Sequence, residues 1–153
     1  SSDLPDYSFV FTGPEDDGFR QHRIHSLKNA YFTGQKKVDE LPAYITAYDV
    51  CINPQMVNDI TDGNYPLKID EYLAMGKPTV ATSTHTMRHI FADHTHLATN
   101  PEEWLSAIDR AVTEADDKEL AKQRIAFAET HSWGHSVKKI YGIIDNFLKE
   151  KAT

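Results

Sequence analysis

The chain of 153 residues is long enough to bury the hydrophobic core of one ordinary domain. Its composition, 40% hydrophobic and 25% charged, is that of a globular protein and lies well away from disordered or membrane-embedded chains. The formal net charge of −7 argues against nucleic acid as a partner, because a surface that binds many phosphates needs an excess of basic side chains.

Short apolar runs alternate with helical patterns up to residue 98. The runs predict strands at residues 7–11, 30–32, 49–52, 79–81 and 96–98, and the patterns predict helices near 18–27, 40–47, 66–75 and 86–91. Strands that are apolar on both faces and alternate with helices favour a parallel sheet covered on both sides, with right-handed crossovers. The sequence therefore predicts a doubly wound, Rossmann-like α/β fold.

Cys51 is the single cysteine of the chain, so no internal disulfide can form. It lies in the third predicted strand, and its apolar neighbours Val50 and Ile52 indicate a buried thiol in a reducing compartment. No apolar run reaches the roughly 18 residues of a membrane span. We therefore expect a cytoplasmic protein.

A cluster of helices is expected after Asn100, which is a typical N-cap residue followed by Pro101 at the first helical position. One helix face collects apolar residues at helical spacing, namely Trp104, Leu105, Ile108 and Val112. Two more helices are expected near 117–130 and 132–149, and we expect Trp133 to pack in the helical core. No linker or repeat is visible, so residues 1–153 are interpreted as a single domain.

The segment Asn64–Val80 combines a loop, a helix and a strand. Pro66 suits the first helical turn and leaves the amides of Leu67 and Lys68 free at the helix start. Such a start attracts phosphate, and Lys68 adds a full positive charge. Glu71, one turn further, has a carboxylate that could accept hydrogen bonds from two ribose hydroxyls. The residues alone also allow Lys68 and Glu71 to be ordinary surface residues of an amphipathic helix.

Several motifs occur in a characteristic order. They are Gly34, the run Glu40–Val50, Pro54, the run Pro-Leu-Lys-Ile-Asp-Glu-Tyr-Leu-Ala-Met-Gly-Lys-Pro-Thr-Val-Ala-Thr at 66–82, whose Gly76 is expected to end the helix, and His131-Ser-Trp133. Over residues 7–133 they resemble the donor-binding half of the group 1 (family 4) glycosyltransferases of GT-B fold. The resemblance implies a retaining, hexosyltransferase-type enzyme in polysaccharide or glycoconjugate biosynthesis. It would move a sugar from a UDP or GDP sugar to a hydroxyl acceptor, either a sugar, a lipid-linked acceptor or another, without a cofactor or a required metal.

The resemblance also implies roles for individual residues. Glu71 matches the second glutamate of a Glu-x7-Glu motif, which binds the donor ribose. The diphosphate would lie at Pro66, Leu67 and Lys68, with Thr12 and Gly13 at the carboxyl end of the first strand opening onto the same crevice. The base would contact Gly34, Gln35 and Lys36. The position of the first glutamate is occupied by Gly63, so we expect Asp62, Asn64 or Tyr65 to contact the sugar.

A second departure from the family concerns the beginning of the donor-binding half. The donor half of the family begins with a further strand and helix that carry an arginine and a lysine, and an acceptor-binding domain precedes it. Neither unit is recognisable in this sequence. We therefore expect a fragment that is inactive alone, whose full enzyme would include its own N-terminal domain and lie in the cytoplasm, with peripheral association at the inner face of the membrane as an alternative.

Histidines suggest a metal site as another hypothesis. His85 and His89 are spaced i, i+4, and His94 and His96 follow, although Asp93 is the one acidic partner with a matching spacing. The remaining candidates are expected to be surface or capping residues: His22, His25, His131 and His135.

Two further classes of function remain open from the residues. One is a non-catalytic α/β module, either nucleotide-sensing or receiver-like, although Asp49 is the one acidic residue that begins a predicted strand. The other is a sugar-nucleotide epimerase of the same fold, which would use a similar donor cleft.

Overall fold

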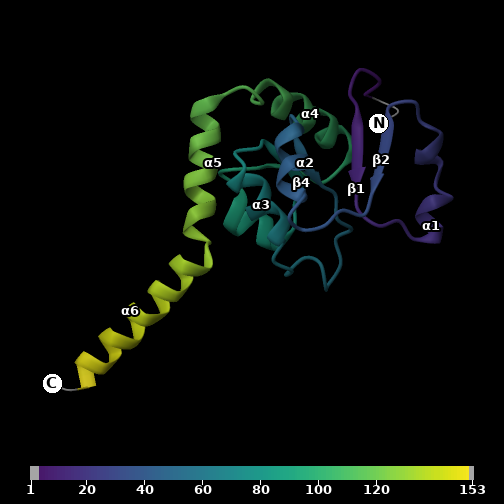
Figure 1. The fold of residues 1–153 in the computed structure, drawn as a ribbon. Helices are drawn as coiled ribbons and strands as arrows, with labels where there is room; N and C mark the ends of the chain where they lie inside the picture. Colours follow the sequence, from purple (N-terminus) through teal and green to yellow (C-terminus); the bar gives the residue numbers. More distant parts are fainter. Residues whose placement is uncertain (1–3, 152–153) are drawn as a thin grey trace. The chain divides into compact units, whose positions relative to one another are not determined.

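The computed structural model describes residues 4–151. The chain forms two compact units, and the boundary falls between Ala47 and Tyr48. The strands pair in parallel in both units, as β1–β2 in the first and as β3–β4–β5 in the second. Helices alternate with these strands along the chain (Figure 1). The predicted α/β class with a Rossmann-like parallel arrangement is confirmed, with the strands divided between two sheets.

The first unit contains β1 (Phe9–Thr12), α1 (Asp17–Arg20), the 3₁₀ turn η1 (Arg23–Ser26), β2 (Ala30–Gly34) and α2 (Leu41–Ala47). The prediction of one helix over 18–27 is wrong, because this segment forms two short pieces. The carboxylate of Asp16 accepts from the amide of Phe19 at 2.7 Å, and Nδ1 of His22 accepts from the amide of Ile24 at 3.3 Å. Each side chain caps its own short turn, so two separate helical pieces begin in this segment.

The second unit has β4 at the centre of its sheet. Its elements are β3 (Cys51–Asn53), α3 (Leu67–Ala74), β4 (Thr79–Thr82), the π-helical turn η2 (Met87–Phe91), β5 (His96–Ala98), α4 (Pro101–Thr113), α5 (Lys118–Thr130) and α6 (Trp133–Lys151). All residues of β4 are buried. Cys51 is 4% exposed, which confirms the predicted buried thiol, and burial raises its pKa to about 12.

The core of the second unit lies around α3. It is formed by Ile69, Leu73, Ala81, Met87, Phe91 and Ala128. Gly76 follows α3 with φ of +71°, as expected for a glycine that ends a helix. A Cβ atom at Gly76 would lie 3.1 Å from Cβ of Ala121. Glycine is therefore required both for the turn and for the close approach of α5.

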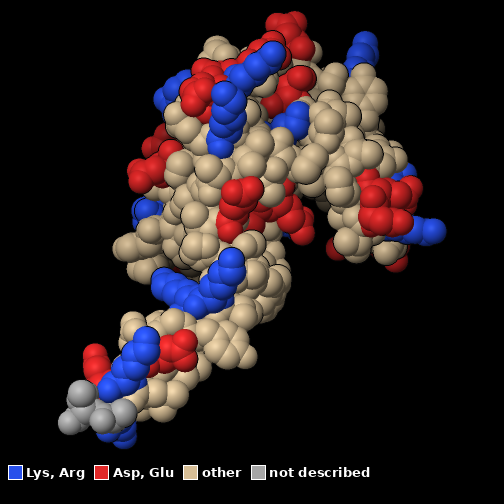
Figure 2. Space-filling model, turned by 60° about the vertical axis from the view of Figure 1, so that its left-hand side comes forward, with Lys and Arg blue, Asp and Glu red and all other residues tan. Residues whose placement is uncertain are grey.

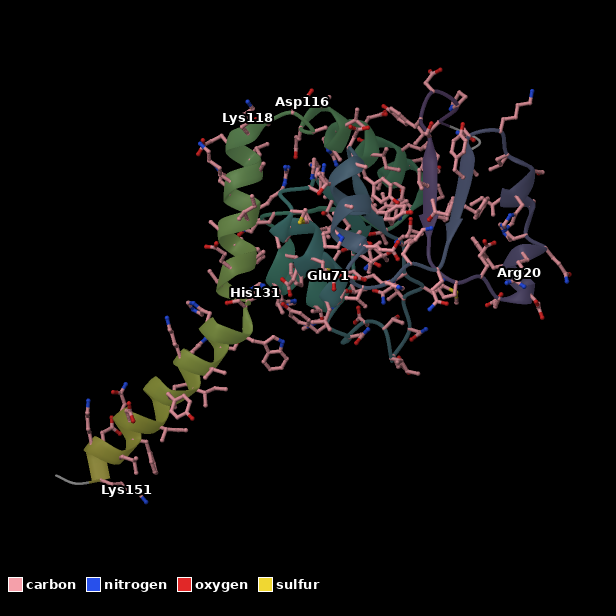
Figure 3. The ribbon with its side chains drawn as sticks, viewed as in Figure 1. Arg20, Glu71, Asp116, Lys118, His131 and Lys151 are labelled. Atoms are coloured by element: carbon pink, nitrogen blue, oxygen red, sulfur yellow. The ribbon has the colours of Figure 1, made fainter. Side chains whose placement is uncertain are left out.

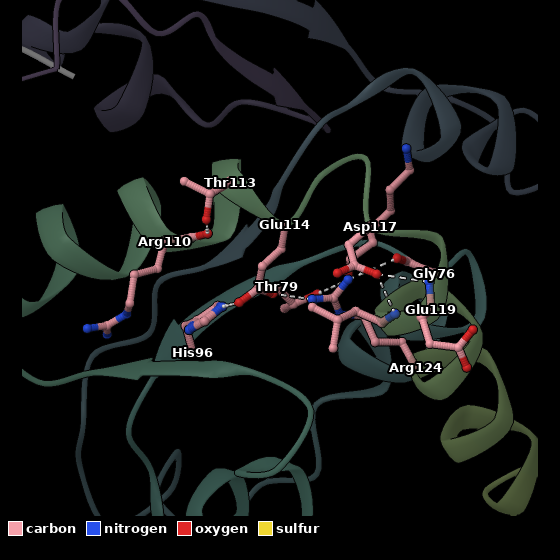
Figure 4. A network of polar contacts seen from close by, with 11 residues as sticks. Gly76, Thr79, His96, Arg110, Thr113, Glu114, Asp117, Glu119 and Arg124 are labelled. Carbon is pink, nitrogen blue, oxygen red and sulfur yellow. Dashed lines mark hydrogen bonds and ion pairs between the residues drawn. The ribbon is translucent and has the colours of Figure 1, made fainter.

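A buried polar network joins α5 to the sheet (Figure 4). The carboxylate of Glu114, which follows α4, pairs with Nε2 of His96 at 2.9 Å and with the guanidinium of Arg124. Arg124 is 5% exposed and also donates to the carbonyl of Gly76 at 3.5 Å. Its charge is thus compensated within the core, as a buried guanidinium requires.

Helix α6 contrasts with the other long helices, because none of its residues is buried. Trp133 is 88% exposed, so the prediction that it packs in the helical core is wrong. The helix itself was predicted correctly, but its main contact within the unit is with α5. In Figure 2, basic and acidic side chains both lie along α6, with uncharged side chains between them on the face in view. Among the described residues, no helix has both the length and the apolar character needed to cross a membrane.

Candidate functional site

The strands β3, β4 and β5 are parallel, so their carboxyl ends lie at the same edge of the sheet. Side chains tie the loops that leave this edge. The amide of Gln55 donates to Oγ1 of Thr82 at 2.8 Å, which joins the loop after β3 to the end of β4. Oδ1 of Asp62 accepts from the amide of His85 at 2.7 Å. Ligand crevices of open α/β sheets form at such an edge, and in this protein the two hydrogen bonds hold the loops at the edge together.

The loop between β3 and α3 is ordered by its own side chains. Oδ1 of Asn58 accepts from the amides of Ile60 and Thr61, both at 3.0 Å, and Oγ1 of Thr61 donates to the carbonyl of Met56. At Gly63, where the resemblance leads one to expect a glutamate, an added Cβ would meet nothing within 4 Å. The backbone therefore leaves room for a side chain at this position.

Helix α3 begins without a side-chain cap. Pro66 is the N-cap residue, with φ of −87° and ψ of 86°, and no side chain accepts from the helix start. The helix predicted near 66–75 begins one residue later, because Pro66 is its N-cap residue and Leu67 is the first helical residue. The amide of Ile69 donates to the carbonyl of Pro66 at 2.9 Å. The amides of Leu67 and Lys68 precede that bond and are the free donors of this helix.

Helix α3 has one buried apolar face and one exposed polar face. Ile69 and Leu73 are fully buried, whereas Lys68 and Glu71 are exposed. Figure 3 shows Glu71 on α3 and His131 at the end of α5. Exposed amides, a lysine and a carboxylate one turn further provide donors for an anion and an acceptor for hydroxyl groups.

A cluster of three side chains lies directly beside this helix start. The hydroxyl of Tyr65 donates to Oδ2 of Asp70 at 2.6 Å, and Nδ1 of His131 lies 2.8 Å from Oδ1 of Asp70. Burial raises the pKa of Tyr65, and the hydrogen bond and negative charge of Asp70 raise it further. The phenol therefore stays protonated and remains a donor at neutral pH.

The sequence did not reveal this cluster. His131 was expected to be a surface or capping residue, and it is the C-cap residue of α5, but its ring is bonded to a helix far away in the sequence. Tyr65 was predicted only as a sugar contact. The spacing of Tyr65 and Asp70 across the first turn of α3 was the one available signal.

An open hollow of about 550 Å³ adjoins the cluster. Its lining comes from the start of α3 and from the junction of α5 and α6, and includes Tyr65, Leu67, Asp70, Thr130, His131 and Trp133. Leu67 is 69% exposed. The start of α3 is therefore accessible from this side.

The predicted site residues of the first unit gather at the carboxyl ends of β1 and β2. The amide of Gly13 donates to the carbonyl of Gly34 at 3.1 Å, and Oγ1 of Thr33 donates to Oγ1 of Thr12 at 2.9 Å. Gly34 has φ of +70°, a conformation that favours glycine. The structure thus brings Thr12, Gly13 and Gly34 together.

The next residues extend from the same strand end. Gln35 is exposed, and the ammonium of Lys36 lies 5.1 Å from the ring centre of Tyr44. The structure therefore describes two groups of predicted residues, one in each unit, both at the carboxyl ends of parallel strands.

The histidines proposed for a metal site have separate partners. The rings of His85 and His89 stack at 4.0 Å, that of His94 stacks on Phe127 at 4.1 Å, and His96 pairs with Glu114. Within residues 4–151, no group of three or more histidine, cysteine or acidic side chains is arranged to hold a metal ion. These four histidines thus do not support the metal hypothesis.

Comparison with known proteins identifies a family for this chain. The family model described as glycosyl transferases group 1 matches residues 2–114, which is more than half of the chain. A protein of Bacillus subtilis (strain 168), "Putative teichuronic acid biosynthesis glycosyltransferase TuaH", is 27% identical over 143 residues. That alignment covers 89% of this chain and 36% of the relative, so the chain spans little more than a third of the relative's length.

Proposed function

The chain belongs to the group 1 glycosyl transferases, and from this premise we propose that the start of α3 binds the donor, a nucleoside diphosphate sugar. The observation that carries the proposal is the uncapped start of α3 at the carboxyl edge of the sheet. A helix start without a side-chain cap, in a chain whose helices α1, α4 and α5 each have one, is suited to an anionic ligand.

The diphosphate binds at the free amides of Leu67 and Lys68, and the ammonium of Lys68 adds its charge. Pro66 contributes by shaping the turn, since it has no N–H to donate. When the bond from the sugar to the diphosphate breaks, negative charge grows on the leaving group. The amides and Lys68 would stabilise this charge, which is electrostatic catalysis at the leaving group.

The contacts proposed for the nucleoside follow from the family resemblance. Glu71 accepts hydrogen bonds from the ribose hydroxyls. In the first unit, the family resemblance assigns Gly34, Gln35 and Lys36 to the base, and Thr12 and Gly13 to the diphosphate. UDP and GDP sugars are both candidates.

The sugar ring would lie at the loop before α3. Asn64 is exposed there, and Tyr65 is partly exposed. Asp62 already uses Oδ1 on the amide of His85, so Oδ2 is the oxygen available to a sugar hydroxyl. Gly63 has no side chain to contribute.

The whole enzyme would transfer a hexosyl group to a hydroxyl acceptor with retention of configuration, without a cofactor or a required metal. The relative of B. subtilis is nearly three times as long as the aligned segment, which supports an acceptor-binding domain outside these residues. We therefore expect the 153 residues alone to bind donor without transferring sugar. Cytoplasmic location, with association at the inner face of the membrane, remains part of the proposal.

The proposal is tested by titration calorimetry with UDP, GDP and their sugars. We expect saturable binding of one nucleotide series, and the Glu71→Ala variant should raise Kd by about 30-fold, since charged hydrogen bonds to ribose are lost. The matched control is Glu102→Ala, which removes an exposed carboxylate from the first turn of α4 and should leave Kd unchanged.

Three results would contradict the proposal. Binding that survives Glu71→Ala unchanged would place the nucleoside elsewhere. Failure of every nucleotide to bind would favour a non-catalytic module, while conversion of a nucleotide sugar to its epimer by the full enzyme would favour the epimerase alternative.

A further inference from the structure

Tyr65, Asp70 and His131 connect three parts of the second unit. Tyr65 ends the loop that leads into α3, Asp70 lies in the first turn of α3, and His131 is the C-cap residue of α5. Nδ1 of His131 lies 2.8 Å from Oδ1 of Asp70 and 3.3 Å from the hydroxyl of Tyr65. Both oxygens of the Asp70 carboxylate are thus engaged by side chains.

The positions of the protons in this cluster follow from which atoms can donate and which can accept hydrogen bonds. The carboxylate of Asp70 accepts, so the hydroxyl of Tyr65 must donate its one proton to Oδ2. The Tyr65 oxygen is then left as an acceptor. Nδ1 of His131 must therefore carry a proton, which points to Oδ1 of Asp70 and secondarily to Tyr65. This assigns the Nδ1–H tautomer whenever the ring is neutral.

The ring of His131 is fixed on its other sides by aromatic contacts. Its centre lies 4.5 Å from that of Phe127 and 5.7 Å from that of Phe91, with both rings nearly perpendicular to it. Phe91 is fully buried, and its ring lies 5.5 Å from that of Tyr65. The histidine is thus anchored to the core while its Nδ1 holds α3.

The bond from Tyr65 to Asp70 spans the entry into α3 without using a backbone amide. In an ordinary cap, a side-chain oxygen accepts from the first amides and occupies them. Here the chain direction at Pro66 is set by two side chains that bond to each other. The amides of Leu67 and Lys68 consequently remain free although the turn that presents them is held.

We propose that Tyr65, Asp70 and His131 are positioning residues that hold the start of α3 in the geometry that binds the donor diphosphate. This inference rests on the proposed function, because it assigns the cluster to the same site. Without the cluster the amides are still present, but the residues before α3 are free to move and binding must order them. The expected signature is a loss of nucleotide affinity that exceeds the loss of stability.

The test uses variants that remove one hydrogen bond and keep the ring. Tyr65→Phe removes the donor to Oδ2, and His131→Phe removes the donor to Oδ1. Each should raise the Kd of the bound nucleoside diphosphate about tenfold, the factor that corresponds to about 1.4 kcal/mol. His131→Asn places an amide N–H near the position of Nδ1, and should return Kd to within about threefold of the unaltered protein.

Controls separate positioning from general damage to the fold. Tyr72→Phe removes a hydroxyl from the same helix, and Tyr141→Phe removes an exposed hydroxyl from the adjoining α6; neither should change Kd. Thermal unfolding is recorded for each variant. Nitrogen-15 NMR of the imidazoles should show the proton of neutral His131 on Nδ1.

The outcomes distinguish this inference from the function on which it rests. If the unaltered protein binds no nucleotide, both are overturned. If Glu71→Ala loses binding while Tyr65→Phe and His131→Phe retain it, the donor site stands and the positioning role is overturned. Failure of His131→Asn to restore affinity, or a neutral His131 with its proton on Nε2, also overturns the positioning role.

Discussion

The first backbone amides of a helix have no partner within the helix, and the starts of α3 and α4 differ in how these amides are treated. At α4, Oδ1 of Asn100 accepts from the amide of Glu103 at 2.9 Å, and the Glu103 carboxylate accepts from the amide of Thr99 at 2.7 Å. At α3, no side chain caps the helix, and Pro66 precedes the first helical residue. The α4 start satisfies its own donors and contributes to stability, whereas the α3 start leaves its first donors without a side-chain partner.

The largest expected effect is on ligand binding at α3. Lys68→Glu replaces an attraction to the diphosphate by a repulsion, and each such pair is worth about 1 kcal/mol or more near a protein surface. We expect Kd for the nucleoside diphosphate to rise about 100-fold, which corresponds to about 2.7 kcal/mol. Calorimetry at low and high salt measures this, and the effect should shrink as salt screens the charges.

The matched variant reverses a charge at α4. Glu102→Lys changes the first turn of a capped helix and should leave Kd unaltered. If both reversals weakened binding equally, net charge would explain the result, and the distinction between the two helix starts would be lost.

The next effect concerns stability at α4. Asn100→Ala removes the cap and should lower the free energy of unfolding by about 1 kcal/mol. For a chain of this size the unfolding midpoint should fall by about 3 °C. Denaturant or thermal unfolding measures the change, and nucleotide affinity should stay constant.

The counterpart is Asn64→Ala, which removes an exposed asparagine just before α3. Because Asn64 does not cap α3, the unfolding free energy should change by less than about 0.5 kcal/mol. A destabilisation as large as that of Asn100→Ala would mean that α3 has a cap in solution after all.

A smaller effect depends on pH. The hydrogen bond from the amide of Thr99 is the largest cause that lowers the pKa of Glu103 from its ordinary value of 4.5. Because the folded-state pKa is the lower one, the ionised carboxylate stabilises the fold above pH 4.5, and this contribution is lost as pH falls through the folded-state pKa.

Glu103→Gln should therefore be less stable than the unaltered protein at pH 7, by less than the loss in Asn100→Ala. The difference should shrink as pH falls through the folded-state pKa of Glu103, because the carboxylate becomes protonated. Thermal unfolding of both proteins from neutral to acidic pH is the measurement, and a difference that stays constant as pH is lowered would show that charge is not its cause.

Local sequence signals predicted the α4 start and not the arrangement around α3. Asn100 accepts from a nearby amide and Pro101 begins the helix, so this cap could be predicted directly, and Gly76 likewise marked the end of α3. Resemblance to a family pointed to Lys68 and Glu71, and Pro66 in place of a capping side chain indicated an open helix start. These features depend on residues close in the chain.

Local sequence signals could not predict contacts between residues that are far apart in the chain. The bond between Asp70 and His131 joins residues 61 positions apart. The exposure of Trp133 was missed because an amphipathic pattern says that a helix has an apolar face, but not what covers it. The interrupted helix after Asp16 was missed because the ring of His22 competes for a backbone amide that the helical pattern had assigned to the helix.

The smallest effect tests the loop that leads into α3. Gly63 has no left-handed φ and an added Cβ meets nothing within 4 Å, so Gly63→Glu should change the unfolding free energy by less than about 0.5 kcal/mol. The new carboxylate would stand where the family resemblance expects the sugar-contacting glutamate. We expect the ratio of Kd for the nucleotide sugar to Kd for the bare nucleotide to fall about twofold, since one exposed hydrogen bond is gained. Gly63→Gln, of the same size without the charge, is the control. Equal changes for the nucleotide and its sugar would show that position 63 does not face the sugar, and would limit the open start of α3 to recognition of the nucleotide.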